Sequence, residues 1–271
     1  MQAELESWLH DVRQLVDLDL LRPADVFRYE SGAADREMAR EAATHARSRL
    51  GIEWGPVGAI SEACAELGQF VRVADIRGDG ASLLDGKVSV ALVSADVQPG
   101  RRRGTAAHEL GHQVLGDEYS SDLGVHTSRS EREAVVDAFA AEFLLPTVAL
   151  RELWPAGRDE VSCRRAAVRI AAEYRVSWSL LLRQAEQLGV LPESWRPRWR
   201  SQAPTRADLL EAAGTTPQPD LDRHQLPLVY TRAVLAAYRR LVIGPGRAVE
   251  LLHGQIDEDE LPLIEEPEPE P

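Results

Sequence analysis

Residues 101–116 read RRRGTAAHELGHQVLG, and their most informative feature is the spacing of His108 and His112. Thr105 is a suitable N-cap and Gly116 a typical helix terminator, so we expect a helix between them. Residues four apart lie on one face of a helix, where two imidazoles can reach a single metal ion. A neutral imidazole nitrogen is a preferred zinc ligand. The stretch therefore predicts a helix that carries two metal ligands.

Glu109 completes the pattern H-E-x-x-H. It lies one residue farther round the expected helix, beside the metal rather than on it. A general base for a metal-activated water must stand at that place. The alternative is a surface helix that holds two histidines by chance. We predict that Glu109 is the catalytic base of the site.

A catalytic zinc site needs a third protein ligand and one open position. The metzincin class would place a glycine three residues, and a histidine six residues, after His112. Leu115 and Glu118 occupy those positions, so that class is excluded. The third ligand must come from farther along the chain.

Residues 130–145 are expected to form the next helix, capped by a serine and ended by a proline. The face that starts at Glu133 continues with Asp137 and then with small or apolar residues, which let two helices approach closely. The face that starts at Glu131 would bury a further carboxylate, Glu142, against the partner helix. We therefore expect Glu133 to be the third ligand. Asp137 is expected to accept a hydrogen bond from one ligand imidazole and so fix its orientation.

The two motifs resemble those of the ImmA/IrrE metallopeptidases, which carry HELGH followed by an E-x-x-A-N-x-F-A-x-x-L-L-M-P block. Residues 133–146 here read EAVVDAFAAEFLLP. Val136, Phe143 and Leu145 are apolar exchanges that a core absorbs. Asp137 stands where the block has Asn and keeps an acceptor, and E-x-x-x-D is also the pattern of thermolysin-like zinc peptidases. The departures therefore leave the expected metal site intact.

The resemblance extends over about residues 30–190 and implies a cytoplasmic, site-specific zinc endopeptidase, with manganese as an alternative metal. It implies a helix-turn-helix transcriptional repressor as substrate, cut to relieve repression in a stress response or on a mobile element. In that family His108, His112 and Glu133 would bind the metal. Glu109 would take the proton from the attacking water and pass it to the leaving amine.

Catalysis also needs a donor for the oxyanion of the transition state. Tyr119, His126 and Arg129 lie near the motifs in sequence, and nothing in the sequence singles out one of them.

Two other functions remain open from the sequence. The helix pair expected over residues 162–188 is basic, but only Arg183, Gln184 and Gln187 on its second helix are of the types that read bases. We therefore favour packing on the peptidase core, or contact with substrate, over DNA binding. The other alternative is a non-catalytic, metal-stabilised protein that binds and regulates a repressor stoichiometrically. The intact Glu109 argues against it, because a structural metal site has no use for a base there.

Periodicity predicts an α+β fold: a zincin-like helical domain with a small antiparallel sheet and appended helices. Strands are expected over 70–76, 81–84 and 88–93, the last two joined by a type I′ turn centred on Asp85-Gly86. Further helices are expected over 5–21, 33–50, 56–67, 162–174, 177–188, 207–213, 230–243 and 247–252. The expected divisions are a metallopeptidase domain (1–155), a helix-turn-helix-like segment (156–200), a C-terminal helical extension (201–254) and an acidic disordered tail (255–271).

The charge is unevenly distributed over the 271 residues. Of the formal net charge of −13, residues 255–271 contribute eight acidic side chains and no lysine or arginine, so the rest carries −5. An acidic body does not attract nucleic acid, and we expect no direct contact with it. The sequence has two cysteines, no signal peptide and no apolar run of about 20 residues, so we expect a cytoplasmic protein that does not enter a membrane.

Overall fold

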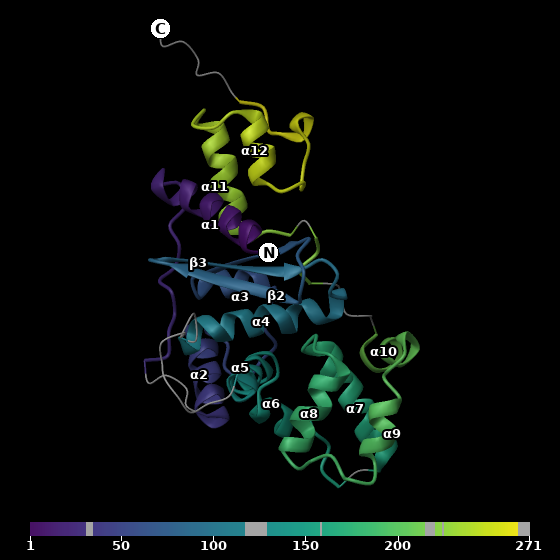
Figure 1. The fold of residues 1–271 in the computed structure, drawn as a ribbon. Helices are drawn as coiled ribbons and strands as arrows, with labels where there is room; N and C mark the ends of the chain where they lie inside the picture. Colours follow the sequence, from purple (N-terminus) through teal and green to yellow (C-terminus); the bar gives the residue numbers. More distant parts are fainter. Residues whose placement is uncertain (31–34, 117–128, 158, 215–219, 224, 265–271) are drawn as a thin grey trace.

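The computed structural model describes residues 1–30, 35–116, 129–157, 159–214, 220–223 and 225–264 (Figure 1). The helices of the first half are α1 (Gln2–Asp17), α2 (Arg36–Arg49), α3 (Ile60–Glu66), α4 (Pro99–Leu115) and α5 (Arg129–Leu144). They are followed by α6 (Thr147–Leu153), α7 (Glu160–Glu173), α8 (Trp178–Gln187), α9 (Arg196–Ser201), α10 (Arg206–Ala213), α11 (Leu228–Arg239), α12 (Pro245–Leu251) and a short 3₁₀ turn, η1 (Glu258–Glu260). The strands are β1 (Gln69–Ala74), β2 (Gly80–Asp85) and β3 (Val88–Ser94). The α+β class with a small sheet and appended helices is confirmed.

The sheet has the strand order β1-β3-β2. β2 and β3 form the expected antiparallel hairpin, but β1 and β3 are parallel, so the expectation of an antiparallel sheet is wrong for that pair. β2 runs antiparallel to β1 but is not its neighbour in the sheet. β3 lies between them and runs in the same direction as β1. Side chains alternate between the two faces of a strand in both parallel and antiparallel sheets, so the sequence pattern does not distinguish the two kinds of pairing.

The hairpin turn also differs from its prediction. Asp85 pairs with Val88, so the two central residues are Gly86 and Lys87. Of these two only Gly86 has a positive φ, at 63°. A glycine at the first central position is the preference of a type II′ turn rather than the predicted type I′.

The sheet separates two hydrophobic cores. Successive strand residues point to opposite faces. On β3, Val90 and Leu92 belong to the core that includes α1, α11 and α12, whereas Ala91 and Val93 belong to the core that includes α2, α3, α4 and α5. Figure 1 shows these helix layers on the two sides of the strands. Both faces of β1 and β3 are thus covered, which explains their nearly continuous apolar runs.

The outer layer joins the beginning and the end of the described chain. Trp8 of α1 packs edge to face on Tyr230 of α11, with ring centroids 4.7 Å apart, and its indole N–H donates to the Phe70 carbonyl of β1 at 2.9 Å. The segment expected as an extension, 201–254, therefore shares a core with the first helix. Among the described residues no helix is both long and apolar enough to cross a bilayer.

The acidic C-terminal segment is ordered farther than expected. Leu261 is buried in the core that includes α1, α11 and α12, and Ile256 packs against that core. The disordered tail predicted from residue 255 is therefore wrong for residues 255–264, because two apolar side chains anchor that stretch. Residues 265–271, the EEPEPEP sequence, lie outside the described residues.

The ends of the two motif helices differ in part from prediction. α4 begins at Pro99, where the missing N–H costs nothing, so Thr105 lies inside the helix and is not its N-cap. Gly116 ends α4 in the left-handed conformation, φ 70°, as expected. α5 begins at Arg129, so Ser130 lies within its first turn. The short helix α6 was not expected.

α4 and α5 approach each other closely at Gly111. A Cβ on Gly111 would lie 2.9 Å from Val136 Cγ1 and 3.1 Å from Phe139 Cδ1 of α5. Side chains do not normally come that close, so glycine is required for this packing. The contact brings the N-terminal half of α5 beside the histidine face of α4.

A buried ion pair fastens the later part of the chain to α4. Arg103 of α4 pairs with Asp220, and both side chains are almost fully buried. Arg103 also donates to the carbonyls of Val57 and Gly58, at 3.0 and 2.8 Å, and Asp220 accepts from the Ile60 backbone N–H at 3.1 Å. One carboxylate thus ties α4 to the segment that leads into α3.

Replacing Asp220 tests this clasp. In Asp220→Ala the Arg103 guanidinium stays buried without its counter-charge, so the free energy of unfolding should fall by about 3–5 kcal/mol. Asp222→Ala, at an exposed position two residues away, is the matched control and should change it by less than about 0.5 kcal/mol. Urea unfolding followed by circular dichroism measures both. Equal free energies of unfolding for the two variants would contradict a stabilising role of the Arg103–Asp220 pair.

Candidate metal centre

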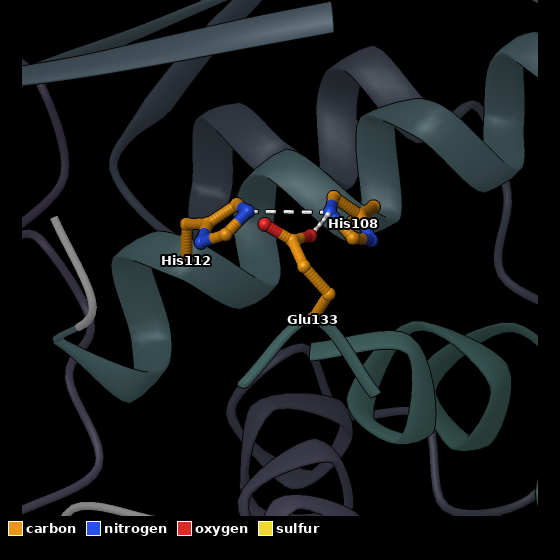
Figure 2. A group of neighbouring side chains, drawn as sticks. All are labelled: His108, His112 and Glu133. Carbon is orange, nitrogen blue, oxygen red and sulfur yellow. Dashed lines mark hydrogen bonds and ion pairs between the residues drawn. The ribbon is translucent and has the colours of Figure 1, made fainter. Parts of the chain in front are cut away.

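Three side chains on two helices converge beside α4 (Figure 2). His108 and His112 project from α4, and Glu133 reaches toward them from α5. The two histidine Nε2 atoms lie 3.2 Å apart, and His108 Nε2 lies 3.2 Å from Glu133 Oε2. One ligand atom from each residue lies within 4.8 Å of those of the others. The structure thus brings together the three ligands expected from the sequence.

Two of the three separations in this cluster fit a tetrahedrally coordinated metal ion. Zinc–ligand distances of about 2.0–2.1 Å imply about 3.3 Å between neighbouring ligand atoms of a tetrahedron. The two measured separations of 3.2 Å are close to that value. Two imidazoles and one carboxylate are also the donor set of catalytic zinc sites, which leave one position open.

Asp137 orients one of the two histidines. His108 Nδ1 lies 3.1 Å from Asp137 Oδ1, which accepts a hydrogen bond from it, so the ring presents Nε2 to the cluster. Burial lowers the pKa of His108, but the Asp137 hydrogen bond and the neighbouring carboxylates raise it above its ordinary value. The same hydrogen bond holds the pKa of Asp137 below its usual range. The sequence left open which histidine Asp137 would serve, and it is His108.

Glu109 is buried between α4 and the edge of the sheet. Its Oε2 accepts a hydrogen bond from the Ser82 hydroxyl of β2 at 2.8 Å. A Cβ on Gly80 would lie 2.8 Å from both Glu109 Oε1 and Thr105 Cγ2, so a larger residue there would push the Glu109 carboxylate from this position. Burial raises the pKa of Glu109, against the opposing effect of the Ser82 hydrogen bond. Sequence analysis missed Ser82, because the register of a strand against a distant helix leaves no signal in the sequence.

A cleft of about 820 Å³ opens over the cluster. Residues 79–82 at β2 form one wall, and residues 175–183, which include the start of α8, contribute another. The faces of α4 and α5 that carry the three metal-site residues complete its lining. The candidate centre is therefore open to a substrate.

Residues 69–186 match the family model of Peptidase_M78, described as the IrrE N-terminal-like domain. The chain carries an M78 peptidase domain. The match runs from β1 into α8, so it contains the cluster and both of these cleft walls, and it confirms the ImmA/IrrE resemblance seen in the motifs. No curated protein matches the chain in sequence. The helices α1, α11 and α12 lie outside the matched segment of the M78 domain.

The other acidic residues of α5 do not enter the cluster of the M78 domain. Glu131 is exposed at the start of the helix. Glu142 is buried, and its Oε1 accepts from the Thr147 backbone N–H at 2.9 Å and from the Thr147 hydroxyl at 3.1 Å. Glu142 therefore anchors the first turn of α6, which explains why a buried carboxylate is tolerated there.

The three residues named as possible oxyanion donors lie at the edge of the described segments or outside them. Tyr119 and His126 lie outside the described residues, and of Arg129 only the backbone is described.

The helix pair α7–α8 of the M78 domain offers few base-reading groups. Gln184 is buried and donates to the Leu145 carbonyl at 2.9 Å. Gln187 accepts from Arg40 at 2.8 Å, and Arg183 lines the metal cleft. One of the three candidate reading residues is thus buried and another is engaged by Arg40, which argues against DNA readout by α8.

Removal of Glu133 tests the ligand set of the M78 domain. Loss of a residue that only hydrogen-bonds to a metal ligand lowers metal affinity by about 10–100-fold. Glu133→Ala removes a ligand itself, so it should lower zinc affinity by more than that. Plasma mass spectrometry after dialysis against a chelator measures the metal bound per chain. Glu131→Ala, on the same helix but outside the cluster, should keep the wild-type metal content. The ligand assignment is refuted if the two variants bind metal equally.

Proposed function

We propose that this chain is a zinc-dependent endopeptidase that cuts a transcriptional repressor of the helix-turn-helix type. The observation that carries the proposal is Glu109: a buried carboxylate beside a His-His-Glu cluster, in an open cleft of an M78 peptidase domain. A site that only stabilised the fold would need neither the carboxylate nor the cleft.

His108, His112 and Glu133 would hold the metal, zinc by its donor chemistry, with manganese as the alternative. The ion supplies Lewis acidity, which polarises a scissile carbonyl and acidifies water. Asp137 keeps the His108 ring in the orientation that presents Nε2. Glu109, whose pKa is raised by burial, takes a proton from the attacking water and delivers it to the leaving amine.

β2 is suited to bind the substrate backbone. It lies at one edge of the sheet, and residues 80–82 line the cleft beside Glu109. An extended peptide that adds to such an edge receives backbone hydrogen bonds along its whole length. A flexible or unfolded segment of the repressor is therefore the part we expect to be cut.

The repressor as substrate, and a role in a stress response or in control of a mobile element, are supported by the ImmA/IrrE character of the M78 domain. A reaction with such a repressor would take place in the cytoplasm.

Glu109→Gln is the first test of catalysis. The neutral amide cannot accept a proton, so cleavage should fall by about 10²–10⁴-fold while the metal content is unchanged. The assay incubates the zinc-loaded chain with the helix-turn-helix repressor encoded beside it and follows fragments by mass spectrometry. If wild type and variant relieve DNA binding by the repressor equally and without fragments, the chain acts as a stoichiometric binder and the proposal fails.

Ser82 is expected to position Glu109. In Ser82→Ala the carboxylate loses a hydrogen bond worth about 1.5–3 kcal/mol, so kcat should fall roughly 10- to 100-fold. KM and metal content should not change, because Ser82 is not a metal ligand. Ser82→Thr, which restores a hydroxyl, should recover most of kcat. Failure of Thr to rescue, or a change confined to KM, would contradict this role.

A further inference from the structure

Three arginines line the metal cleft of a strongly acidic chain: Arg101, Arg175 and Arg183. The lining of the cleft also holds four acidic residues, Asp79, Glu109, Glu133 and Asp137. The partners of each guanidinium decide whether its charge is available to a substrate.

Arg101 and Arg175 are partly engaged. Arg101 lies 4.0 Å from Asp79, and both side chains are about 70% exposed, a pair of little energetic weight. Arg175 donates to the carbonyls of Val57 and Gly58, at 3.2 and 2.8 Å, and lies 3.8 Å from Asp220. Asp220 already pairs with Arg103, so its single charge is shared between two guanidiniums.

Arg183 lies beside a residue that contacts the metal cluster. Its side chain is half exposed, and among the described residues its nearest carboxylate oxygen is Asp137 Oδ2, at 4.0 Å. The other oxygen of Asp137 accepts from His108 at 3.1 Å. The guanidinium therefore stands one side chain away from the metal cluster, with most of its donors directed to no group of the described chain.

The acidic residues of the cleft are already committed. Glu133 belongs to the metal cluster, Glu109 accepts from Ser82, and Asp137 accepts from His108. Asp79, the fourth, lies 4.0 Å from Arg101, so these two charges offset each other. A divalent ion in the cluster would offset the charges of Glu133 and Glu109. The charge left to face the flanks of a bound peptide is then positive and comes from the arginines.

We propose that Arg183 selects substrates that carry an acidic side chain within about two residues of the scissile bond. The proposal rests on the peptidase function above and names a feature of its substrate. An extended peptide advances about 3.3 Å per residue, so a side chain one or two residues from the reacting carbonyl reaches a group beside Asp137. A guanidinium fork binds a carboxylate through two parallel hydrogen bonds, which gives both strength and direction.

Cleavage specificity is the first arm of the test. The full-length zinc-loaded chain is incubated with a degenerate decapeptide mixture, and the cleaved bonds are read by mass spectrometry. Asp or Glu should be enriched at least 5-fold at one position within two residues of the cut. Arg183→Glu should lose that preference and favour Lys or Arg at the same position. Arg169→Glu, exposed on α7 and outside the cleft lining, should keep the wild-type preference.

Binding is the second arm and does not need turnover. The zinc-loaded Glu109→Gln chain is titrated with fluorescein-labelled alanine-rich decapeptides that differ only in one Glu or one Lys at each position. The best Glu peptide should bind at least 10-fold tighter than its Lys counterpart, and the added Arg183→Glu change should reverse the order. A role of Arg183 that is only structural would weaken both peptides alike.

The outcomes separate the two proposals. Cleavage without an acidic preference, or a preference unchanged in Arg183→Glu, overturns the role of Arg183 and leaves the peptidase function standing. Charge-reversed binding without any cleavage by the wild type supports the role of Arg183 and overturns the peptidase function. Binding of neither peptide set at millimolar concentration overturns the role of Arg183.

Discussion

The contact of α4 with α5 at Gly111 is the constraint on which the metal centre depends. Glycine at this place lets Val136 and Phe139 lie where a Cβ would clash. Glu133 precedes Val136 by about one helical turn, so the same contact carries its carboxylate to 3.2 Å from His108. The HELGH motif thus supplies two candidate ligands, and its glycine leaves the space that brings the third candidate, Glu133, close to them. A wider helix separation would leave three isolated polar residues.

The remaining structure holds this helix pair in place from several sides. β2 contacts Glu109 through Ser82, and Gly80 leaves room for the Glu109 carboxylate beside the strand. The ion pair of Arg103 with Asp220 fixes α4 from a segment beyond the M78 match. Buried charges are tolerated only when they are paired and hydrogen-bonded, so these contacts specify one position of α4. The second core, built from α1, α11 and α12, covers the far face of the sheet.

The arginines of α7 and α8 and of the turn between them are interpreted differently from the sequence and from the structure. Counted along the sequence, the arginines of residues 162–188 suggest a nucleic-acid surface. In space Arg183 and Arg175 line the metal cleft, and Gln184 is buried against the Leu145 carbonyl. In that position the basic side chains would favour an acidic peptide over a cationic one, because they line the cleft that holds the candidate metal cluster.

By itself the sequence predicted most of the helices, α6 and α9 excepted, the spacing of His108 and His112, the choice of Glu133 over Glu131 and Glu142, and the resemblance to the M78 family. These follow from helical periodicity and from the apolar character of one face, which are properties of neighbouring residues.

Only the tertiary structure decided that β3 lies between β1 and β2, that Asp137 serves His108, and that Ser82 and Arg183 border the site. It also decided that α1 shares a core with α11 and α12. These are contacts between segments far apart in the chain. No local pattern encodes the strand order, the helix separation or the register on which they depend.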